Sequence, residues 1–327
     1  MKIKNSISVV IPNFNGKSLL EKNIPFVYTA LKTSDIEDFE IIVSDDHSSD
    51  NSVDFIRTSY PGVILIENTT NKGFAGNTNI GISKAGKDLV FILNSDVELT
   101  AGYFKTLLKY FEKPDTFGVM GRIISLNSDK IQDGAKFSEY SFAKIKTHIN
   151  YICKTKYSLY SYFLSGANAL VDREKLLKIG GFNEVFNPYN SEDVDLGFMA
   201  WRLGYKCYYD HNAVCRHPNS ATLKREPSQK LKNISKRNKY FLHFIHLNRL
   251  ELTYYLIHLA IKTLFRAIIL DSNYLKTTFS FVCSLDKCIE SRHRLKELQK
   301  QNKQKISLRD VSFFINHEIG ITPITRF

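Results

Sequence analysis

The chain has 327 residues, a formal net charge of +12, and a composition of 43% hydrophobic and 13% aromatic residues. This apolar content can form a packed core, which excludes disorder over most of the length, and the length suits two compact domains or one large domain with an additional region. The five cysteines show no CxxC spacing, which excludes a zinc ribbon and a disulfide framework and favours reduced thiols. The first residues lead directly into an apolar run without a signal-peptide pattern, so we expect a protein that stays inside the cell.

The N-terminal part of the chain alternates short apolar runs with segments of helical apolar spacing. Runs that predict strands cover residues 7–11, 39–43, 63–66 and 89–93. Segments that predict helices cover residues 17–32, 51–59 and 74–85. This regular alternation predicts βαβ units and a mostly parallel sheet, which is an α/β fold.

The pattern is less regular after residue 96. Strands are predicted at residues 117–124, 163–171, 205–209 and 213–216, and helices at 103–111, 173–179 and 192–203. Residues 127–160 are polar and aromatic and give no assignment. From residue 227 onward the spacing is helical, without the alternation of a strand.

Carboxylates follow two of these segments. The apolar run 89–93 leads into Asp96, and a carboxylate at the carboxyl end of a strand in an open α/β sheet points into the crevice where such folds bind ligands. A second acidic pair, Glu192 and Asp193, begins a predicted helix. A second carboxylate in reach can hold a divalent metal or accept a proton, so this pattern favours metal-assisted group transfer from a phosphorylated donor.

Short polar motifs recur along the first two thirds of the chain. In the first half they are SVVIPNFNG at 8–16, SDDHSSD at 44–50, NKGFAGNTN at 71–79 and LNSD at 93–96. In the second half they are SGANAL at 165–170, GGFNE at 180–184, EDVDL at 192–196, GYK at 204–206 and HPNSAT at 217–222. In this order they resemble family 2 glycosyltransferases, and the later motifs resemble the rhamnosyltransferase-like bacterial branch. The resemblance covers residues 6–222.

The resemblance implies a GT-A fold, which is Rossmann-like, and inverting transfer of a sugar from a nucleotide diphosphate donor. From the residues alone, Asp45 at a strand end can accept a hydrogen bond from a pyrimidine N–H, whereas Asp46 and Asp50 can cap the next helix. We assign base recognition to Asp45 and capping to Asp50. The residues expected at the nucleotide are Pro12, Asn13, Asn15, Asp45, Asp46, Asn71, Lys72, Gly73, Asn77, Asn94 and Ser95.

The motif Asn94-Ser95-Asp96 departs from the Asp-x-Asp form common in this fold, so Asp96 is expected to carry most of the binding of a metal ion. A hard cation such as Mg²⁺ or Mn²⁺ would take diphosphate oxygens as further ligands. By resemblance, His217 contacts the metal or the diphosphate. The alternatives are a carboxylate in an ordinary turn and a structural histidine.

The resemblance assigns the general base to Asp193, while Glu192 holds the acceptor or its loop. Asp195 is expected on the helix surface or as a cap. The alternative for the acidic pair is a charged helix N-terminus that the helix dipole favours. The single tryptophan, Trp201, is expected in the core.

The excess of positive charge lies in the last third, since residues 224–305 contain 18 Lys and Arg against 6 Asp and Glu. The stretch 253–270 has the length of a membrane span but contains Lys262 and Arg266, so we expect a helix lying in the membrane interface. The alternative is a helical annex that packs on the catalytic domain. The chain shows no RRM, KH or zinc pattern, so nucleic acid is not an expected partner.

We therefore predict a catalytic domain at 1–223, with a nucleotide-sugar half to about residue 125 and an acceptor half after it, and a basic helical region at 224–327. The predicted function is a metal-dependent inverting glycosyltransferase on the cytoplasmic face of the bacterial cell membrane. It would transfer a sugar from dTDP-rhamnose, a UDP-hexose or UDP-galactofuranose to a saccharide acceptor, which we expect to be lipid-linked. The product would be a surface polysaccharide such as O-antigen or capsule. A nucleotidyltransferase would need a Gly-rich, basic signature after the first strand, which is missing. A non-catalytic binding subunit is disfavoured because Asp96 and Asp193 are retained.

Overall fold

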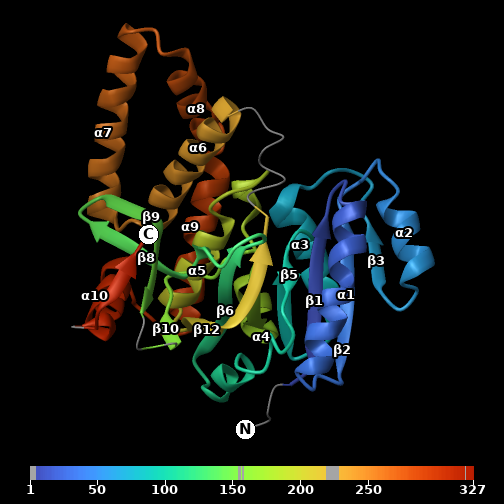
Figure 1. The fold of residues 1–327 in the computed structure, drawn as a ribbon. Helices are drawn as coiled ribbons and strands as arrows, with labels where there is room; N and C mark the ends of the chain where they lie inside the picture. The colour runs from blue at the N-terminus through green and yellow to red at the C-terminus, as the bar shows by residue number, and fades with distance from the viewer. Residues whose placement is uncertain (1–4, 154–155, 157, 219–227, 321) are drawn as a thin grey trace.

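The computed structural model describes residues 5–153, 156, 158–218, 228–320 and 322–327. These residues form a ten-stranded mixed sheet in which the order β10-β12-β6-β11-β4-β1-β2-β3 is continuous, while β5 pairs with β12 and β7 with β6 (Figure 1). The strands are β1 Ile7–Asn13, β2 Phe39–Asp45, β3 Ile64–Glu67, β4 Leu89–Leu93, β5 Glu98–Leu99, β6 Thr116–Ser125, β7 Ile131–Asp133, β10 Ser158–Tyr160, β11 Asn168–Asp172 and β12 Lys206–His217.

The half of the sheet that contains β1 to β4 is parallel, and β11 joins it antiparallel to both β4 and β6. The helices of this part are α1 Lys17–Thr33, α2 Ser52–Ser59, α3 Gly73–Lys84, α4 Arg173–Ile179 and α5 Glu192–Arg202, with the 3₁₀ helices η1 Leu108–Glu112 and η2 Glu184–Phe186. The sequence of a strand that is buried on both faces is a continuous apolar run, because side chains on each face pack on helices. In β1, Val9 belongs to the core that includes α1, and Val10 belongs to the core that includes α3.

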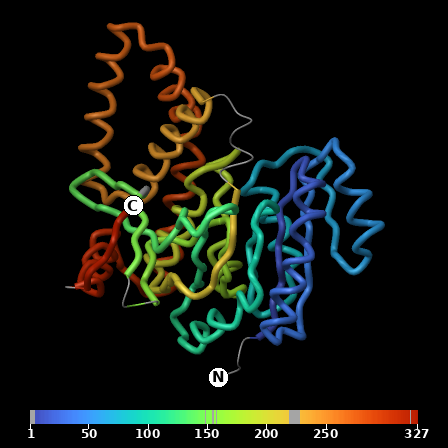
Figure 2. Tube along the Cα trace, viewed as in Figure 1, coloured from blue at the N-terminus to red at the C-terminus, as the bar shows by residue number. Residues whose placement is uncertain are grey.

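The C-terminal region consists of helices and one strand. These are α6 Ser228–His246, α7 Arg249–Ile268, α8 Ser272–Val282, α9 Leu285–Gln301, α10 Leu308–Ile319 and β13 Ile324–Arg326. The strand β13 completes a small antiparallel sheet with β8 Ala135–Ser141 and β9 Lys144–Cys153. The Cα trace shows α7 and α8 projecting away from the rest of the molecule as a hairpin (Figure 2).

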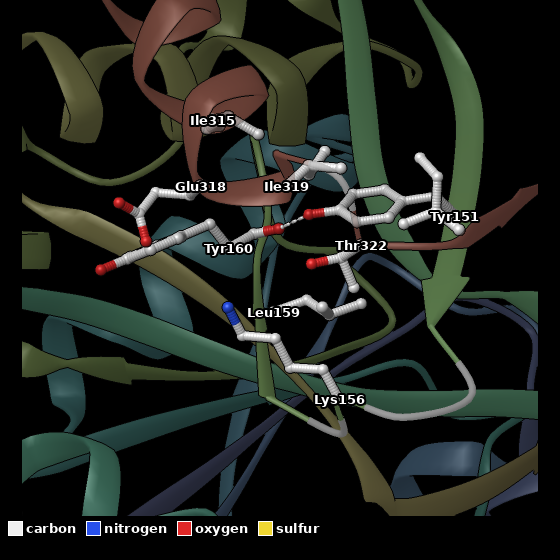
Figure 3. A pocket seen from close by; sticks show the side chains of 9 residues that line it. Tyr151, Lys156, Leu159, Tyr160, Ile315, Glu318, Ile319 and Thr322 are labelled. Atoms are coloured by element: carbon white, nitrogen blue, oxygen red, sulfur yellow. Dashed lines mark hydrogen bonds between the residues drawn. The ribbon is translucent and has the colours of Figure 1, made fainter.

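Helices from the C-terminal region share one core with the sheet. Phe314 of α10 packs against Tyr160 and Trp201, and Trp201 is buried as expected. Figure 3 shows where the end of α10 lies beside β9 and β10, and the Tyr151 hydroxyl there donates to the backbone oxygen of Tyr160. The core therefore depends on residues that are far apart in the sequence.

The structure confirms the α/β fold with its mostly parallel sheet and corrects several elements. Residues 103–111 form successive turns and then η1, because their backbone bonds run between residues three apart, as from Leu107 N–H to Phe104 oxygen. The predicted strand 163–171 begins only at Asn168. The predicted strands 205–209 and 213–216 are one strand, β12, with an irregularity between Asp210 and Val214. The strand β13 was not predicted.

Candidate active site

The carboxyl ends of β1 and β2 bring Asn13 and Asp45 together, because these residues are register partners in the parallel ladder. Asn13 Nδ2 donates to Asp45 Oδ2 at 2.8 Å, and both side chains are buried. The Asp45 carboxylate also accepts from the backbone N–H and the hydroxyl of Ser48 at 2.8 and 2.7 Å. These bonds fix Asp45 at the sheet edge where the sequence predicts the nucleotide base.

The loop after β1 leaves one polar atom without a partner. Among the described residues, the buried Asn13 Oδ1 has no hydrogen bond. A Cβ on Gly16 would lie 2.3 Å from this oxygen, so glycine is required at that position. Asn15, with φ of 50°, accepts from the Ser49 N–H at 2.7 Å and so ties this loop to the one after β2.

Asp46 holds the loop before α3 and does not cap α2, which corrects the capping alternative. Its carboxylate accepts from the N–H groups of Lys72 and Gly73 at 2.7 and 3.0 Å, where α3 begins. Asp50 does meet helix ends: it accepts from the N–H of Ser52 in α2 at 3.1 Å and from that of Lys17 in α1 at 3.0 Å. The two carboxylates therefore organise three loops at one edge of the sheet.

The expected nucleotide residues of the 71–79 motif differ in exposure. Asn71 and Lys72 are exposed, and Gly73 has φ of +73°, a conformation that glycine adopts without strain. Asn77 is buried, and its amide accepts from the Ser44 hydroxyl at 2.7 Å and donates to the Ser44 oxygen at 2.9 Å. Asn77 therefore joins α3 to β2, while the exposed residues face solvent.

The ends of β4 and β12 bring the two predicted metal ligands together. His217 Nε2 lies 3.2 Å from Asp96 Oδ1, and both side chains are mostly buried. Two adjacent ligand atoms, each about 2.1 Å from one cation in octahedral geometry, lie about 3 Å apart, so this spacing fits a shared Mg²⁺ or Mn²⁺. The described residues contain no cluster of three or more metal-ligating side chains, so further ligands would come from the donor and water. The rest of the HPNSAT motif, from residue 219, lies outside the described residues.

A backbone connection links the metal motif to the acidic pair. The Asn94 N–H donates to the Ala167 oxygen at 3.2 Å, and the neighbouring Gly166 lies against Asp193, since a Cβ on this glycine would be 3.9 Å from the Asp193 Cβ. On the other side of the motif, the Ser95 oxygen accepts from Asn23 Nδ2 at 2.8 Å. The loop between β10 and β11 therefore lies between Asp193 and the end of β4.

The acidic pair begins α5 after Ser191, which adopts a left-handed conformation with φ of 76°. Burial, together with the charge of Asp193, raises the pKa of Glu192 to about 8, and Glu192 Oε2 is buried with no partner among the described residues. Burial also raises the pKa of Asp193, but the positive charge of Lys136 and the N–H groups of Val194 and Gly166 oppose that rise. Two backbone N–H groups also oppose the rise for Glu192, so the charge of Lys136 is what distinguishes the surroundings of Asp193.

Lys136 was not among the residues expected from the sequence. It lies in β8, within the region that gave no assignment, and forms an ion pair with Asp133 and a 3.1 Å hydrogen bond to Asn150 Oδ1. Its charge reaches Asp193 only because β8 folds back toward α5. No local pattern in residues 127–160 signals this proximity.

Asp195 is buried, which corrects the expectation that it faces the helix surface or caps the helix. Asp195 Oδ1 accepts from His246 Nε2 of α6 at 2.7 Å, and both side chains are almost fully buried. Asp195 lies in the core because its hydrogen-bond partner lies there: the ring of His246 packs edge-on against Phe198. The acidic motif therefore connects α5 to the C-terminal region.

The fold and this edge of the sheet are those of a glycosyltransferase of the GT-A type. The family model "Glycosyl transferase family 2" matches residues 8–180 of the 327, and the chain belongs to that family.

Two curated relatives are bacterial glycosyltransferases. The GalNAc(5)-diNAcBac-PP-undecaprenol beta-1,3-glucosyltransferase of Campylobacter jejuni is 35% identical over 107 residues, which is 32% of this chain and a third (33%) of that protein. The O-antigen chain rhamnosyltransferase RfbN of Salmonella typhimurium is 28% identical over 228 residues, 67% of this chain and 68% of that one.

Solved structures confirm the fold. GalNAc-T7, crystallised with UDP, GalNAc and Mn²⁺, superposes with a TM-score of 0.65 at 18% identity and covers 97% of this chain, which spans 58% of that structure. The mannosyltransferase PcManGT of Pyrobaculum calidifontis, in complex with GDP-Man and Mn²⁺, gives a TM-score of 0.52 at 14% identity, covering 95% of this chain and 85% of its own. At these identities the similarity establishes the GT-A fold alone.

Proposed function

We propose that this protein is an inverting, metal-dependent glycosyltransferase that moves a sugar from a nucleotide diphosphate donor to a saccharide acceptor. The observation that carries the proposal is the arrangement of two groups at one edge of the sheet. Asp96 and His217 lie 3.2 Å apart at the ends of β4 and β12, and Asp193 lies against Gly166, next to Ala167, whose oxygen accepts from the Asn94 N–H. Asp96 and His217 suit a diphosphate with its cation, and Asp193 suits an acceptor hydroxyl.

On the donor side, Asn13 and Asp45 would receive the base, and the exposed Lys72 would meet a phosphate. The remaining residues predicted from the sequence would complete this surface. Asp96 and His217 would hold Mg²⁺ or Mn²⁺, which when bound offsets the charge that develops on the leaving nucleoside diphosphate. The complexes of GalNAc-T7 with UDP and Mn²⁺ and of PcManGT with GDP-Man and Mn²⁺ support this choice of donor class and cation.

On the acceptor side, the ionised Asp193 would take the proton of the acceptor hydroxyl. The acceptor oxygen then bonds to the anomeric carbon as the bond from that carbon to the diphosphate oxygen breaks, and the nucleoside diphosphate leaves with the electron pair. A single displacement of this kind inverts the anomeric configuration. Glu192, with its raised pKa, would remain protonated near neutral pH and donate a hydrogen bond to the acceptor or its loop.

The donor would be dTDP-rhamnose or a UDP-sugar, and the acceptor a lipid-linked saccharide in the synthesis of a bacterial surface polysaccharide. Support comes from the two relatives described above, one a rhamnosyltransferase of an O-antigen chain and the other a glucosyltransferase named for a PP-undecaprenol glycan. Such an acceptor would place the catalytic region, residues 1–223, at the cytoplasmic face of the membrane, with residues 224–327 as the part that meets the anionic surface.

The test is a screen of nucleotide sugars for thermal stabilisation and for donor hydrolysis, with Mn²⁺ and with a chelator. We expect one donor class to stabilise the protein only with the cation, and Asp96→Asn to remove that dependence while the fold survives. The exposed Asp54→Asn serves as the matched control. If no nucleotide sugar acts with either cation, or if Asp96→Asn keeps the full metal effect, the proposed site is wrong.

A further inference from the structure

An apolar stripe runs along the outer side of α7 and continues over the tip of the α7–α8 hairpin. Its side chains range from 49% exposed at Ile269 to 83% at Leu270. We call the following set the hairpin stripe: Leu250, Tyr254, Ile257, Ile261, Leu264, Phe265, Ile268, Ile269, Leu270, Phe279 and Val282. Within α7 these positions recur every three or four residues, which places them along one side of the helix. Exposed apolar surface that is this continuous marks a site of interaction.

The opposite side of α7 is occupied by the protein itself. Tyr255 stacks on His243 of α6 with ring centroids 4.6 Å apart, and Leu259 is buried in the core. On α8, Tyr274 is buried beneath the ammonium of Lys236, which lies 3.7 Å from the centre of its ring. Because its inner side is already packed, the hairpin holds its stripe outward, away from the rest of the chain.

The charges on the hairpin favour a lipid surface as the occupant. Residues 249–283 contain only two acidic residues, and neither is a free surface charge. Glu251 is buried and bonded to the Tyr140 hydroxyl, and Asp271 pairs with Arg266 at 3.0 Å. Exposed Lys276 remains, while Lys262 Nζ lies 6.0 Å from the centre of the Tyr274 ring, so the stripe is accompanied by cations and by no free carboxylate of this segment. Apolar side chains beside lysines and arginines are typical of helices that lie in the interface of anionic membranes.

The cations of α6 are less suited to this role than those of the hairpin. Arg237 donates to the Asn187 oxygen and, at 2.9 Å, to Asn238 Oδ1, and Lys236 lies on the Tyr274 ring. These two basic residues therefore hold the protein together, although they belong to the densest run of positive charge in the sequence. Among the described residues, no helix has the length and apolarity to cross a membrane.

We propose that the α7–α8 hairpin inserts its stripe into the interface of an anionic bilayer, with Lys276 at the lipid phosphates. This inference rests on the proposed function for the lipid-linked acceptor that makes a membrane relevant. In Figure 1 the hairpin tip extends toward the same side of the molecule as the carboxyl end of β12, which carries His217. Docking through the tip therefore turns the edge of the sheet with Asp96 and His217 toward the lipid surface.

The experiment compares two triple variants of the full chain. Ile261→Ser, Leu264→Ser and Phe265→Ser change the hairpin stripe, and Ile64→Ser, Leu177→Ser and Phe313→Ser remove the same three residue types from exposed positions elsewhere. Both proteins and the wild type are sedimented with vesicles of phosphatidylcholine and phosphatidylglycerol at low and high salt, and their thermal unfolding and donor binding are measured. We expect the hairpin variant to lose at least about tenfold in vesicle affinity, while the control variant binds like the wild type.

Several results would overturn the proposal. If the hairpin variant binds vesicles as well as the wild type, the stripe is not the docking surface. If the wild type binds no vesicles and elutes as a dimer that the hairpin variant converts to a monomer, the stripe joins two copies of the chain. A wild type that is monomeric and does not bind vesicles would also refute the proposal. Failure of every nucleotide sugar would refute the proposed function but leave the vesicle result intact, so the two failures are distinguishable.

Discussion

Glu192 and Asp193 are adjacent in the sequence, but their surroundings give the two carboxyl groups different protonation behaviour. Burial and the charge of Asp193 raise the pKa of Glu192 to about 8. For Asp193, burial is opposed by Lys136 and by two backbone N–H groups. The positive charge of Lys136 therefore favours the ionised form of Asp193, while burial favours the protonated form of Glu192, and different surroundings of this kind separate the roles of paired carboxyl groups.

Replacement of the base is expected to abolish most of the transfer activity. Asp193→Asn keeps the size of the side chain but cannot accept the proton, and general base catalysis contributes about 10²- to 10⁴-fold. Sugar transfer should fall by that factor, while donor affinity, measured by calorimetry on the same preparation, should stay unchanged. A variant that transfers at the wild-type rate would place the base elsewhere, and a variant that loses donor affinity as well would give Asp193 a structural or metal-binding role.

Protonation of Glu192 predicts a pH-dependent stability. The pKa of Glu192 is about 8 in the folded protein, against an ordinary value of 4.5. Below pH 4.5 both the folded and the unfolded state hold the proton, and its contribution to stability is fully present. As the pH rises toward 8, the unfolded state loses the proton first, so this contribution is lost. The wild type should thus lose stability relative to Glu192→Gln between about pH 4.5 and 8, and the difference should level off above that range. Thermal unfolding of both proteins at several pH values measures this difference in stability. The exposed Glu112→Gln provides the control, and a constant difference across this range would refute the raised pKa.

At the scale of elements, α5 and α6 are joined through a buried contact between Asp195 and His246. Burial lowers the pKa of His246 despite the opposing bond to Asp195, so the imidazole is neutral and donates from Nε2. Asn238 adds a second connection, since its amide donates to the oxygens of Phe186, Tyr189 and Asn190. The loop and helix that carry the acidic pair are therefore held by α6.

Removing this contact should destabilise the protein. His246→Ala leaves the buried Asp195 carboxylate without its donor, and leaving a buried acceptor without its hydrogen bond typically costs about 1–3 kcal/mol, or more for a charged group. Denaturant unfolding measures the cost, with the exposed His317→Ala as the matched control. Combination with Asp195→Asn should recover part of the loss. If His246→Ala and His317→Ala unfold alike, the contact contributes little.

At the scale of the whole molecule, the C-terminal helices complete the core. Phe241 and Leu295 belong to the same cluster of apolar side chains as the β-sheet residues Val10 and Ile92, and the partly buried Phe314 packs against it. The surplus of positive charge therefore belongs to a region with a structural role in addition to the proposed membrane contact.

A chain that ends at Pro218 is accordingly expected to fail to fold stably. It would keep Tyr160 of β10 and Trp201 of α5 but lose Phe314, which packs on both, and α6, which holds the acidic helix. Exposed apolar surface of this kind promotes aggregation. Solubility and near-ultraviolet circular dichroism, compared with the full chain, test this expectation. A soluble truncated protein with the tertiary spectrum of the full chain would show that the core does not require residues 228–327.

The sequence by itself determined the elements of the parallel half-sheet and the family, because both depend on local patterns. Runs such as 89–93 and the spacing of 17–32 predict β4 and α1 within a residue, since burial on each face acts on neighbouring positions. The motif order, likewise, is read directly along the chain.

Only the tertiary structure decided which side chains meet. The charge of Lys136 near Asp193 and the bond from His246 to Asp195 each join residues on different elements, whereas the approach of Asp96 and His217 was expected from the family resemblance alone. The sequence also did not determine whether the hairpin stripe is exposed. The apolar spacing of α7 is the same for a helix whose apolar side is buried in a core and for one whose apolar side faces outward. Long-range packing sets these features, and it has no signature in a local run of residues.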